Sequence, residues 1–452
     1  MKNAPAKREI IGWSALAMLS LAIAGVFALL LALSRVPGAA EVFPWPVRFF
    51  EKGLIVHVVL SFIVWIFAVM GALMTLAAGR LAAGPPRWRI LGPAALVCAY
   101  LATVLILIPA WLDRGEPSLN NYVPAIIDPL YYLGLALLAA GVALAAIRVL
   151  ANLAGRKGPL EPVSLAVSAT ALLYLLALAC FLLAFFDLAG TARGDIDAAF
   201  NEDLFWGGGH VLQFVNVGLM LGAWYVLGGL ALAEPLVHPR LMMVALGLLV
   251  VAALPAPFLY GGIVLEPFSA THRQVFTDMQ YLLAPPMLLV GGGAATTLLR
   301  RARGDGLPWR DPVLLSLVAS MAVFALGGVL GLFVDGADTR TPAHYHGVIG
   351  GINLAFMGVF FGLLLPLVDR APEKAKTARA SIWLYAVGQA AHAIGLFWAG
   401  GYGAPRKTMT ADGLQALGST IGLYIVGIGA VIAVVGGVTF IVLVARALLG
   451  RR

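Results

Sequence analysis

Long apolar stretches repeat along almost the whole chain and are separated by short polar segments. Each stretch has about twenty residues or more, the length that an α-helix needs to cross a hydrocarbon core of about 30 Å. The apolar residues run continuously and do not alternate with polar ones, which excludes a transmembrane β-barrel. We therefore predict an all-α, polytopic membrane protein.

The pattern predicts a single domain of twelve transmembrane helices over residues 1–452. No soluble domain interrupts the helices. The first apolar stretch lacks a clear small-residue cleavage site, so it is interpreted as a retained span. The predicted spans are residues 10–34, 53–79, 89–111, 123–150, 162–190, 205–233, 239–265, 278–300, 311–334, 344–369, 379–403 and 417–448.

Charge predicts the orientation of these spans. The chain is 61% hydrophobic and only 12% charged, whereas soluble domains carry about 25% charged residues. Lys and Arg gather in alternate segments such as GRLAAGPPRWR and RRARGDGLPWR, while DRGEPSLNN and ARGDIDAAFNED are acidic. The positive-inside rule then predicts a cytoplasmic N-terminus. The net charge of +8 follows from this topology and gives no indication of nucleic-acid binding. No Lys or Glu falls in the inner half of a predicted span.

Histidines are concentrated at one depth. Ionisable groups inside a membrane are costly, so they are candidates for function. Two of the seven histidines have ordinary interpretations. His238 is a solvated loop residue, and His392, in the middle of a span, is a packing residue or, as the alternative, part of a proton path. The other five lie near the predicted outer ends of spans: His57, His210, His272, His344 and His346.

The segment TPAHYHGVIGG carries His344 and His346 two residues apart. Helical residues advance by about 100° each, so these two side chains point about 200° apart. Two planar cofactors that flank the helix fit this geometry better than one metal ion does. Haem iron accepts neutral imidazole as an axial ligand. The chain has two cysteines and no CxxCH motif, so a haem would be held non-covalently.

Twelve spans, with histidines on the second, sixth, seventh and tenth, resemble the catalytic subunit I of the haem–copper oxidoreductase superfamily over nearly the whole chain. The resemblance implies two haems, one low-spin and one high-spin, and one non-haem iron or copper ion. His57 and His346 would be the axial ligands of the low-spin haem, and His344 would be the proximal ligand of the high-spin haem. His210 and His272 would hold the second metal.

The segment GYGAPRKT looks like the family's Pro-Arg-Arg segment. The resemblance implies that Arg406 and Lys407 bind haem propionates, which suits two cations beside carboxylates. It also implies a multi-pass protein of the bacterial cytoplasmic (inner) membrane, with the haems near the periplasmic side. The partners would be membrane lipid and an electron donor, either a small subunit of the cytochrome c or cupredoxin type or a quinol.

Three positions depart from the family's pattern. Thr271 stands where the first of two adjacent histidines is usual. Phe214 stands where many oxygen reductases carry a redox-active tyrosine, one turn after the helix 6 histidine. Leu212 replaces the glutamate that delivers protons in the best-known oxidases. The ligand set of the second metal is therefore incomplete in this chain.

Three other residues are candidates to complete the site. Gln213 shares a helix face with His210 and offers an amide oxygen. Glu266 offers a carboxylate near His272, and Tyr260 is a candidate redox tyrosine, since one oxidase family draws its tyrosine from helix 7. Oxygen ligands suit iron better than they suit copper(I).

These departures favour the reduction of nitric oxide to nitrous oxide, which needs two electrons and no tyrosyl radical. The first alternative is a terminal oxygen reductase of the cytochrome c oxidase-like, cbb-type class, which reduces dioxygen to water. The second alternative is a non-catalytic haem-binding protein or a transporter. Transporter sites lie near the midplane between internal repeats, whereas these histidines are shallow and no repeat is evident.

Overall fold

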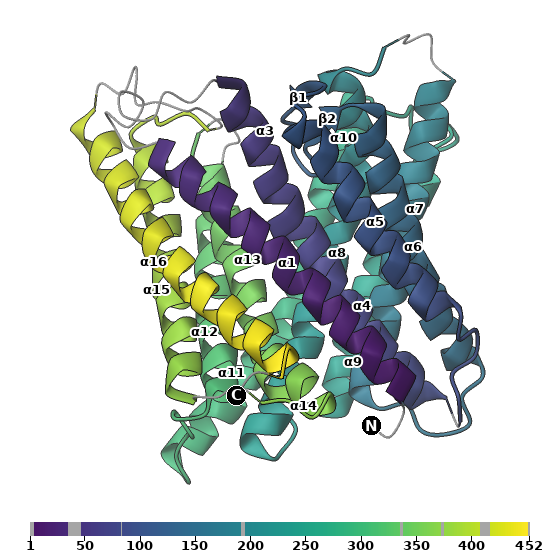
Figure 1. Cartoon of the computed structure of the whole chain (residues 1–452), viewed down its shortest axis with the longest axis vertical. Helices are drawn as coiled ribbons and strands as arrows, with labels where there is room; N and C mark the ends of the chain where they lie inside the picture. Colours follow the sequence, from purple (N-terminus) through teal and green to yellow (C-terminus); the bar gives the residue numbers. More distant parts are fainter. Residues whose placement is uncertain are drawn as a thin grey trace. The chain divides into compact units, whose positions relative to one another are not determined.

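The computed structural model describes residues 4–34, 47–82, 84–190, 195–334, 338–371, 375–406 and 416–450. In these residues twelve helices are long and apolar enough to cross a membrane, which confirms the all-α polytopic fold (Figure 1). The elements in chain order are α1 (Ala4–Ser34), α3 (Val47–Val58), the π-helical turn η1 (Val59–Val64), α4 (Trp65–Leu81), α5 (Leu91–Trp111), β1 (Glu116–Ser118), β2 (Ala125–Ile127), α6 (Pro129–Ala154), α7 (Pro162–Ala189), α8 (Ala198–Leu232), α9 (Pro239–Ala253), the 3-10 turn η2 (Ala256–Leu259), α10 (Ala270–Met279), the 3-10 turn η3 (Gln280–Leu283), α11 (Ala284–Arg303), α12 (Pro312–Gly331), α13 (Arg340–Val359), the π-helical turn η4 (Phe360–Leu364), α14 (Leu365–Leu367), α15 (Ala375–Gly401) and α16 (Leu417–Leu448).

The chain forms two compact units, which are described separately. Unit 1 comprises Met1–Ala17, Ile66–Gly229 and Glu234–Leu307. It contains most of the elements from α4 to α11, including the short hairpin of β1 and β2. Unit 2 comprises Met18–Trp65, Leu230–Ala233 and Pro308–Arg452. It contains most of α1, and α3, η1 and the elements from α12 to α16.

Local sequence explains where several helices begin. Proline lacks a backbone N–H and suits the first position of a helix, and α6, α7, α9 and α12 all begin with proline. Asp128 and Asp311 cap α6 and α12, each by accepting a bond from a backbone N–H two residues later, at 2.8 and 2.9 Å. The exposed His238 caps α9 in the same way, since its Nδ1 accepts from the N–H of Arg240 at 3.2 Å.

Several spans begin elsewhere than predicted, and for the fourth and the eighth the local structure shows the reason. The fourth begins at Pro129 because the residues before it form the antiparallel hairpin of β1 and β2, with Glu116 opposite Ile127. The eighth begins at Ala270, eight residues earlier than predicted, because Ser269 caps α10 and the helical path continues through η3 into α11. His272 therefore lies at the start of the eighth span and not on the seventh.

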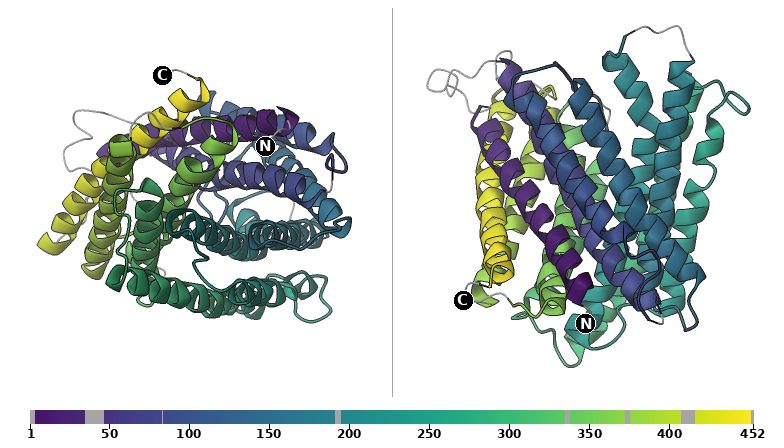
Figure 2. Two further views of the ribbon diagram at one scale, coloured as in Figure 1. Left: turned by 90° about the horizontal axis from the view of Figure 1, so that it is seen from below. Right: turned by 45° about the vertical axis from the view of Figure 1, so that its right-hand side comes forward.

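Helices in unit 2 approach each other closely through glycine. In α13, a Cβ atom at Gly347 would lie 2.4 Å from the Cα atom of Gly327 in α12, so neither position has room for a side chain. A Cβ atom at Gly388 of α15 would lie 2.3 Å from the backbone nitrogen of Ala433 in α16. Helices α15 and α16 run side by side (Figures 1 and 2). Small residues at such contacts are typical of membrane helix pairs.

A buried ion pair lies in unit 1. The carboxylate of Glu9 lies 2.6 Å from Nη1 of Arg148 in α6, and both side chains are buried. Gly92 leaves room for the pair, since a Cβ atom there would lie 2.0 Å from that nitrogen. The expectation that no Lys or Glu falls in the inner half of a span is therefore wrong. The first span begins at Pro5 and includes Lys7 and Glu9, and the eleventh begins at Ala375 and includes Lys376. Buried charges persist when they are paired in this way.

Candidate functional site

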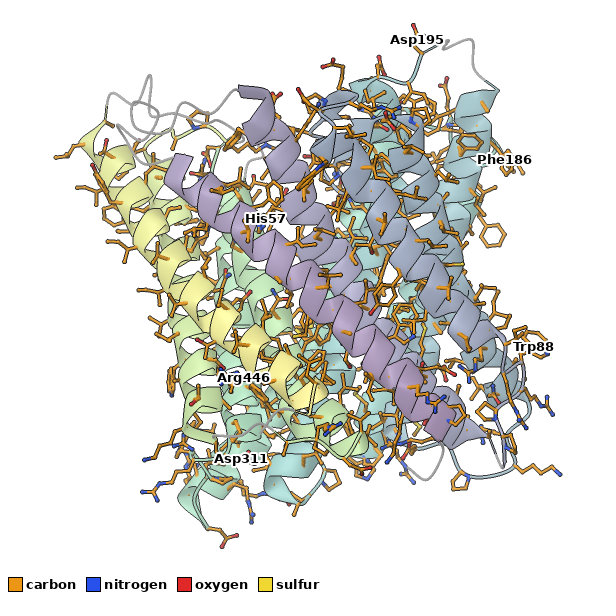
Figure 3. The ribbon with its side chains drawn as sticks, viewed as in Figure 1. His57, Trp88, Phe186, Asp195, Asp311 and Arg446 are labelled. Carbon is orange, nitrogen blue, oxygen red and sulfur yellow. The ribbon has the colours of Figure 1, made fainter. Side chains whose placement is uncertain are left out.

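The three predicted haem ligands His57, His344 and His346 belong to unit 2 (Figure 3 labels His57). Nδ1 of His57 lies 3.0 Å from the carbonyl oxygen of Ala24 in α1, and Nδ1 of His344 lies 2.8 Å from that of Gly327 in α12. A carbonyl oxygen can only accept, so Nδ1 carries the ring hydrogen in both residues and Nε2 keeps its lone pair. Ligating histidines have this arrangement, so both residues fit a haem ligand.

His346 contacts His392, and their ring centroids are 4.3 Å apart at 60°. His392 was interpreted as a packing residue, and it packs against a predicted haem ligand. Nδ1 of His392 lies 3.0 Å from the carbonyl oxygen of Val426 in α16. Since His392 is not a predicted ligand, the pairing of Nδ1 with a carbonyl does not identify ligands by itself.

The start of α13, which carries His344 and His346, is attached to the loop after α15. The backbone N–H of Thr339 donates to the carbonyl of Ala404 at 3.0 Å, and Asp338 pairs with Pro405 in an antiparallel bridge. The Thr339 hydroxyl donates to the carbonyl of Leu396 at 2.7 Å. These bonds fix the entry of the helix against α15.

Arg406 follows this bridge directly, and Gly403 makes the preceding turn with a φ of +82°, which favours glycine. The predicted propionate-binding arginine is therefore held next to the start of α13. Lys407, its predicted partner, lies outside the described residues.

His210, a predicted ligand of the second metal, lies on α8 in unit 1 and is 2% exposed. Its Nδ1 lies 2.7 Å from the carbonyl oxygen of Trp206, one turn earlier in the helix. Its Nε2 lies 2.9 Å from the hydroxyl oxygen of Tyr122. Because Nδ1 must donate to the carbonyl, Nε2 is the acceptor and the Tyr122 hydroxyl donates to it.

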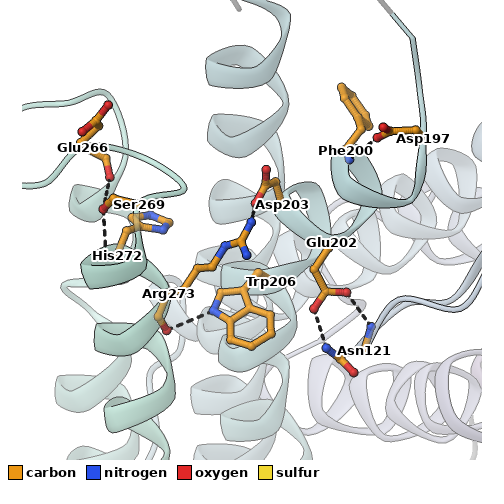
Figure 4. Close-up of polar contacts among 10 residues, drawn as sticks. All are labelled: Asn121, Asp197, Phe200, Glu202, Asp203, Trp206, Glu266, Ser269, His272 and Arg273. Carbon is orange, nitrogen blue, oxygen red and sulfur yellow. Dashed lines mark hydrogen bonds and ion pairs between the residues drawn. The ribbon is translucent and has the colours of Figure 1, made fainter. Parts of the chain in front are cut away.

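Tyr122 is a contact that the sequence analysis missed. It lies between β1 and β2, and the neighbouring Asn121 is fixed to α8, since its backbone N–H donates to the Glu202 carboxylate at 3.0 Å (Figure 4). Gly209 leaves room for the tyrosine, because a Cβ atom there would lie 2.4 Å from the Cβ atom of Tyr122. The available signal was its position in a predicted outer segment, at the depth of the histidines.

His272, the other predicted ligand of the second metal, lies in the first turn of α10 and is 1% exposed. Within the part of the chain that the structure describes, neither of its ring nitrogens has a hydrogen-bond partner. Buried polar groups in native proteins nearly always have one, so the ring fits a metal ligand. The next residue, Arg273, forms an ion pair with Asp203 of α8 and accepts a bond from Trp206 Nε1 at 3.1 Å (Figure 4).

Tyr260 lies beside His272, with ring centroids 5.0 Å apart. Its hydroxyl is buried and has no partner among the described residues. Burial and the nearby Cys180, Asp187 and Asp203 raise the pKa of Tyr260, so the phenol stays protonated. The ring of Phe276 contacts His272 and Tyr260, and it also contacts His210.

Among the contacts of the described residues, neither of the remaining two candidates, Gln213 and Glu266, is bonded through its side chain to a histidine. Gln213 accepts a long bond of 3.4 Å from Asn216 on its own helix. Glu266 is exposed, and its carboxylate points away from the His272 ring (Figure 4). No group of three or more His, Cys, Asp or Glu side chains able to hold a metal ion is found in the described ranges. In the structure, His210 is hydrogen-bonded to Tyr122, and the ring of His272 contacts the ring of Tyr260.

Comparisons with known proteins concern the family and the fold of the chain. The family model described as "Cytochrome C and Quinol oxidase polypeptide I" matches residues 10–439. An uncharacterised protein of Aquifex aeolicus is 31% identical over 355 residues, which cover 78% of this chain and 84% of the relative. An uncharacterised protein of Rickettsia prowazekii is 26% identical, over 95% of this chain and 94% of the relative.

A solved structure of a heme-copper terminal oxidase dimer is similar to this chain with a TM-score of 0.81. The match covers 99% of this chain and 85% of that chain, at 17% sequence identity. At this identity the likeness concerns the fold alone.

Proposed function

The chain belongs to the cytochrome c and quinol oxidase polypeptide I family, the subunit I of haem–copper oxidoreductases, and we propose that it is the catalytic subunit of a respiratory reductase of nitric oxide. Nitrous oxide is the product. Membership of this family supports an oxidoreductase that works in a membrane. The choice of substrate rests on residues of this chain.

In this proposal His57 and His346 bind a low-spin haem, and His344 binds a high-spin haem. What supports these roles is the direction of the imidazoles. The Nδ1 atoms of His57 and His344 face backbone carbonyls at 3.0 and 2.8 Å, which leaves Nε2 for iron. Arg406 and Lys407 bind propionates, as two cations in one loop would do.

His210 and His272 hold the second metal, an iron ion, in this proposal. Both are almost fully buried, His210 on α8 and His272 on α10, and the ion pair between Asp203 and Arg273 joins these two helices. When bound, the haems and this metal supply electrons and a Lewis acid to nitric oxide. The buried aromatic rings of Tyr260 and Phe276 exclude water from the imidazoles.

The observation that carries nitric oxide over oxygen is Phe214, which is fully buried one turn after His210. A phenyl ring cannot donate an electron and a proton as tyrosine does at that position in many oxygen reductases. Reduction of two nitric oxide molecules takes two electrons and two protons and gives nitrous oxide and water. A tyrosyl radical is therefore not needed.

Oxygen reduction is the second candidate, and Tyr260 favours it. Its hydroxyl is buried without a partner among the described residues, and its ring lies 5.0 Å from that of His272. A tyrosine there could supply the additional electron and proton from a segment other than α8.

The remaining parts of the proposal concern the surroundings of the enzyme. We place it in the bacterial inner membrane with a cytoplasmic N-terminus and with the haems near the periplasmic side, as the basic and acidic segments predict. The electron donor is a small subunit of the cytochrome c or cupredoxin type, or a quinol. The exposed carboxylates of Asp195 and Asp197 offer a basic donor opposite charge (Figure 3 labels Asp195).

The test is spectroscopy of the purified protein with gas-consumption assays. His346→Ala should remove the low-spin haem signal, and His344→Ala should abolish carbon monoxide binding to the reduced protein. His238→Ala, an exposed helix cap, is the control and should keep both signals. Wild-type protein should consume nitric oxide and contain non-haem iron. If the protein consumes oxygen but no nitric oxide, the proposed substrate changes to oxygen. If the purified protein contains no haem, the proposal is rejected.

A further inference from the structure

The hydroxyl of Tyr122 occupies the one nitrogen of His210 that is free to bind a metal. Nδ1 is committed to the carbonyl of Trp206 at 2.7 Å, and Nε2 receives the Tyr122 hydroxyl at 2.9 Å. A metal ion held by His210 must therefore bind on the side of the ring where the Tyr122 hydroxyl now lies. Either the phenol leaves, or its oxygen becomes a ligand.

The separation of the two atoms fits two ligands of a common metal. First-row metals lie about 2.0–2.2 Å from imidazole nitrogen and from oxygen ligands. Two ligands at a right angle are then about 2.9 Å apart, which is the distance between Tyr122 Oη and His210 Nε2. A metal ion at these bond lengths lies to one side of the line between the two atoms and can link them in place of the hydrogen.

The surrounding structure keeps Tyr122 in this place. Asn121 is clamped to α8 by Glu202, through its backbone N–H and its side-chain amide. The tyrosine ring packs edge-on against Trp206, with centroids 5.8 Å apart. Gly209 provides the space that the tyrosine occupies.

The second-metal site also lacks a ligand. Thr271, at the position of the family's additional histidine, is exposed, and neither Gln213 nor Glu266 approaches His210 in the described contacts. We propose that Tyr122 is an oxygen ligand of the second metal and binds it together with His210. This inference rests on the proposed function, since it assigns a ligand to the metal of that same centre.

The chemistry of the bond favours iron. On binding, the phenol O–H bond breaks, the proton passes to solvent, and a metal–oxygen bond forms with no change in oxidation state. Phenolate is a hard donor that also binds iron in catalase, and oxygen donors suit iron better than copper(I). A ligand from the loop between α5 and α6 thus takes the place of the missing histidine.

The experiment compares wild-type protein, Tyr122→Phe, Tyr122→His and a matched control, Tyr132→Phe. The control removes a similar bond to α8, since the Tyr132 hydroxyl donates to the side chain of Asn201 at 2.9 Å. No hydrogen bond or ring contact in the described part of the chain joins Tyr132 to a histidine. The first readout is the ratio of co-purified non-haem metal to haem. The second is resonance Raman spectroscopy of oxidised protein grown with ring-deuterated tyrosine, in which metal–phenolate bands shift.

We expect Tyr122→Phe to lose the phenolate bands and at least about tenfold in metal affinity, with the haem spectrum retained. Tyr122→His should retain metal without phenolate bands, and Tyr132→Phe should match wild type. Wild-type metal without phenolate bands would overturn the ligand assignment and leave the proposed function standing. If wild-type protein contains haem but no non-haem metal, both the ligand assignment and the proposed function are rejected.

Discussion

The side chains of Tyr260 and Phe276 pack against Gly207 of α8. A Cβ atom there would lie 2.2 Å from the hydroxyl oxygen of Tyr260 and 2.6 Å from Cζ of Phe276. Both neighbours are buried, so an added methyl group has to displace at least one ring. Overpacking of this kind costs about 1–3 kcal/mol.

Gly207→Ala should therefore lower the thermal stability of the protein in detergent and broaden the signals of the site. Gly229→Ala, on the same helix, meets nothing within 4 Å. It should leave stability unchanged or raise it, since alanine favours helix by about 0.5–1 kcal/mol. Equal melting temperatures for the two variants would show that the rings do not rest on Gly207.

The sequence indicated the histidines but not the residues that contact their rings. Buried imidazoles are expensive in a membrane, so their number and shared depth were informative. The bond between Tyr122 and His210 joins residues 88 apart. It depends on a hairpin that apolar periodicity does not reveal, because that pattern assigned residues from 123 onward to a helix. The orientation of Glu266 likewise depends on local folding after η2.

The N-terminus of helix α13 is stabilised by the carboxylate of Asp338, whose charge depends on pH. Burial tends to raise the pKa of Asp338, but hydrogen bonds and the charge of Arg340 lower it overall from 3.8. The carboxylate accepts from the Arg340 backbone N–H at 2.8 Å and pairs with its guanidinium at 2.7 Å. Since the folded-state pKa is the lower one, the pair stabilises the fold above pH 3.8, and this contribution is lost as the pH falls through the folded value.

Asp338→Asn should therefore destabilise the protein near neutral pH by up to about 1 kcal/mol. The difference from wild type should shrink as the pH falls from about 6 to about 3. Thermal unfolding at several pH values, followed by the haem absorbance and by helix content, measures it. A difference that is constant with pH would show that Asp338 acts only as a backbone hydrogen-bond acceptor.

Element boundaries were predictable where capping chemistry is explicit. Proline at the first position and Asp in front of it mark α6 and α12, and the prediction placed the start of α12 within one residue. The start of α6 was predicted too early because its N-terminal flank is apolar and forms β2. For α10 the polar residues around His272 concealed a helix, although Ser269 was available as its cap.

For the whole molecule, an even number of candidate spans among the described residues predicts that Ala4 and Gly450 lie on the same side of the membrane. The basic segments predict that this side is the cytoplasm. A green fluorescent protein fused after Arg452 should fluoresce, and alkaline phosphatase at that point should be inactive. The same phosphatase inserted after Asn120 should be active. The reverse pattern would invert the orientation and the proposed periplasmic position of the haems.

The direction of each imidazole is decided by backbone carbonyls of Ala24, Trp206 and Gly327, which are part of the helices themselves. A backbone carbonyl is present whatever side chain its residue carries. The acceptor that orients each imidazole is therefore independent of the side-chain chemistry at these three positions.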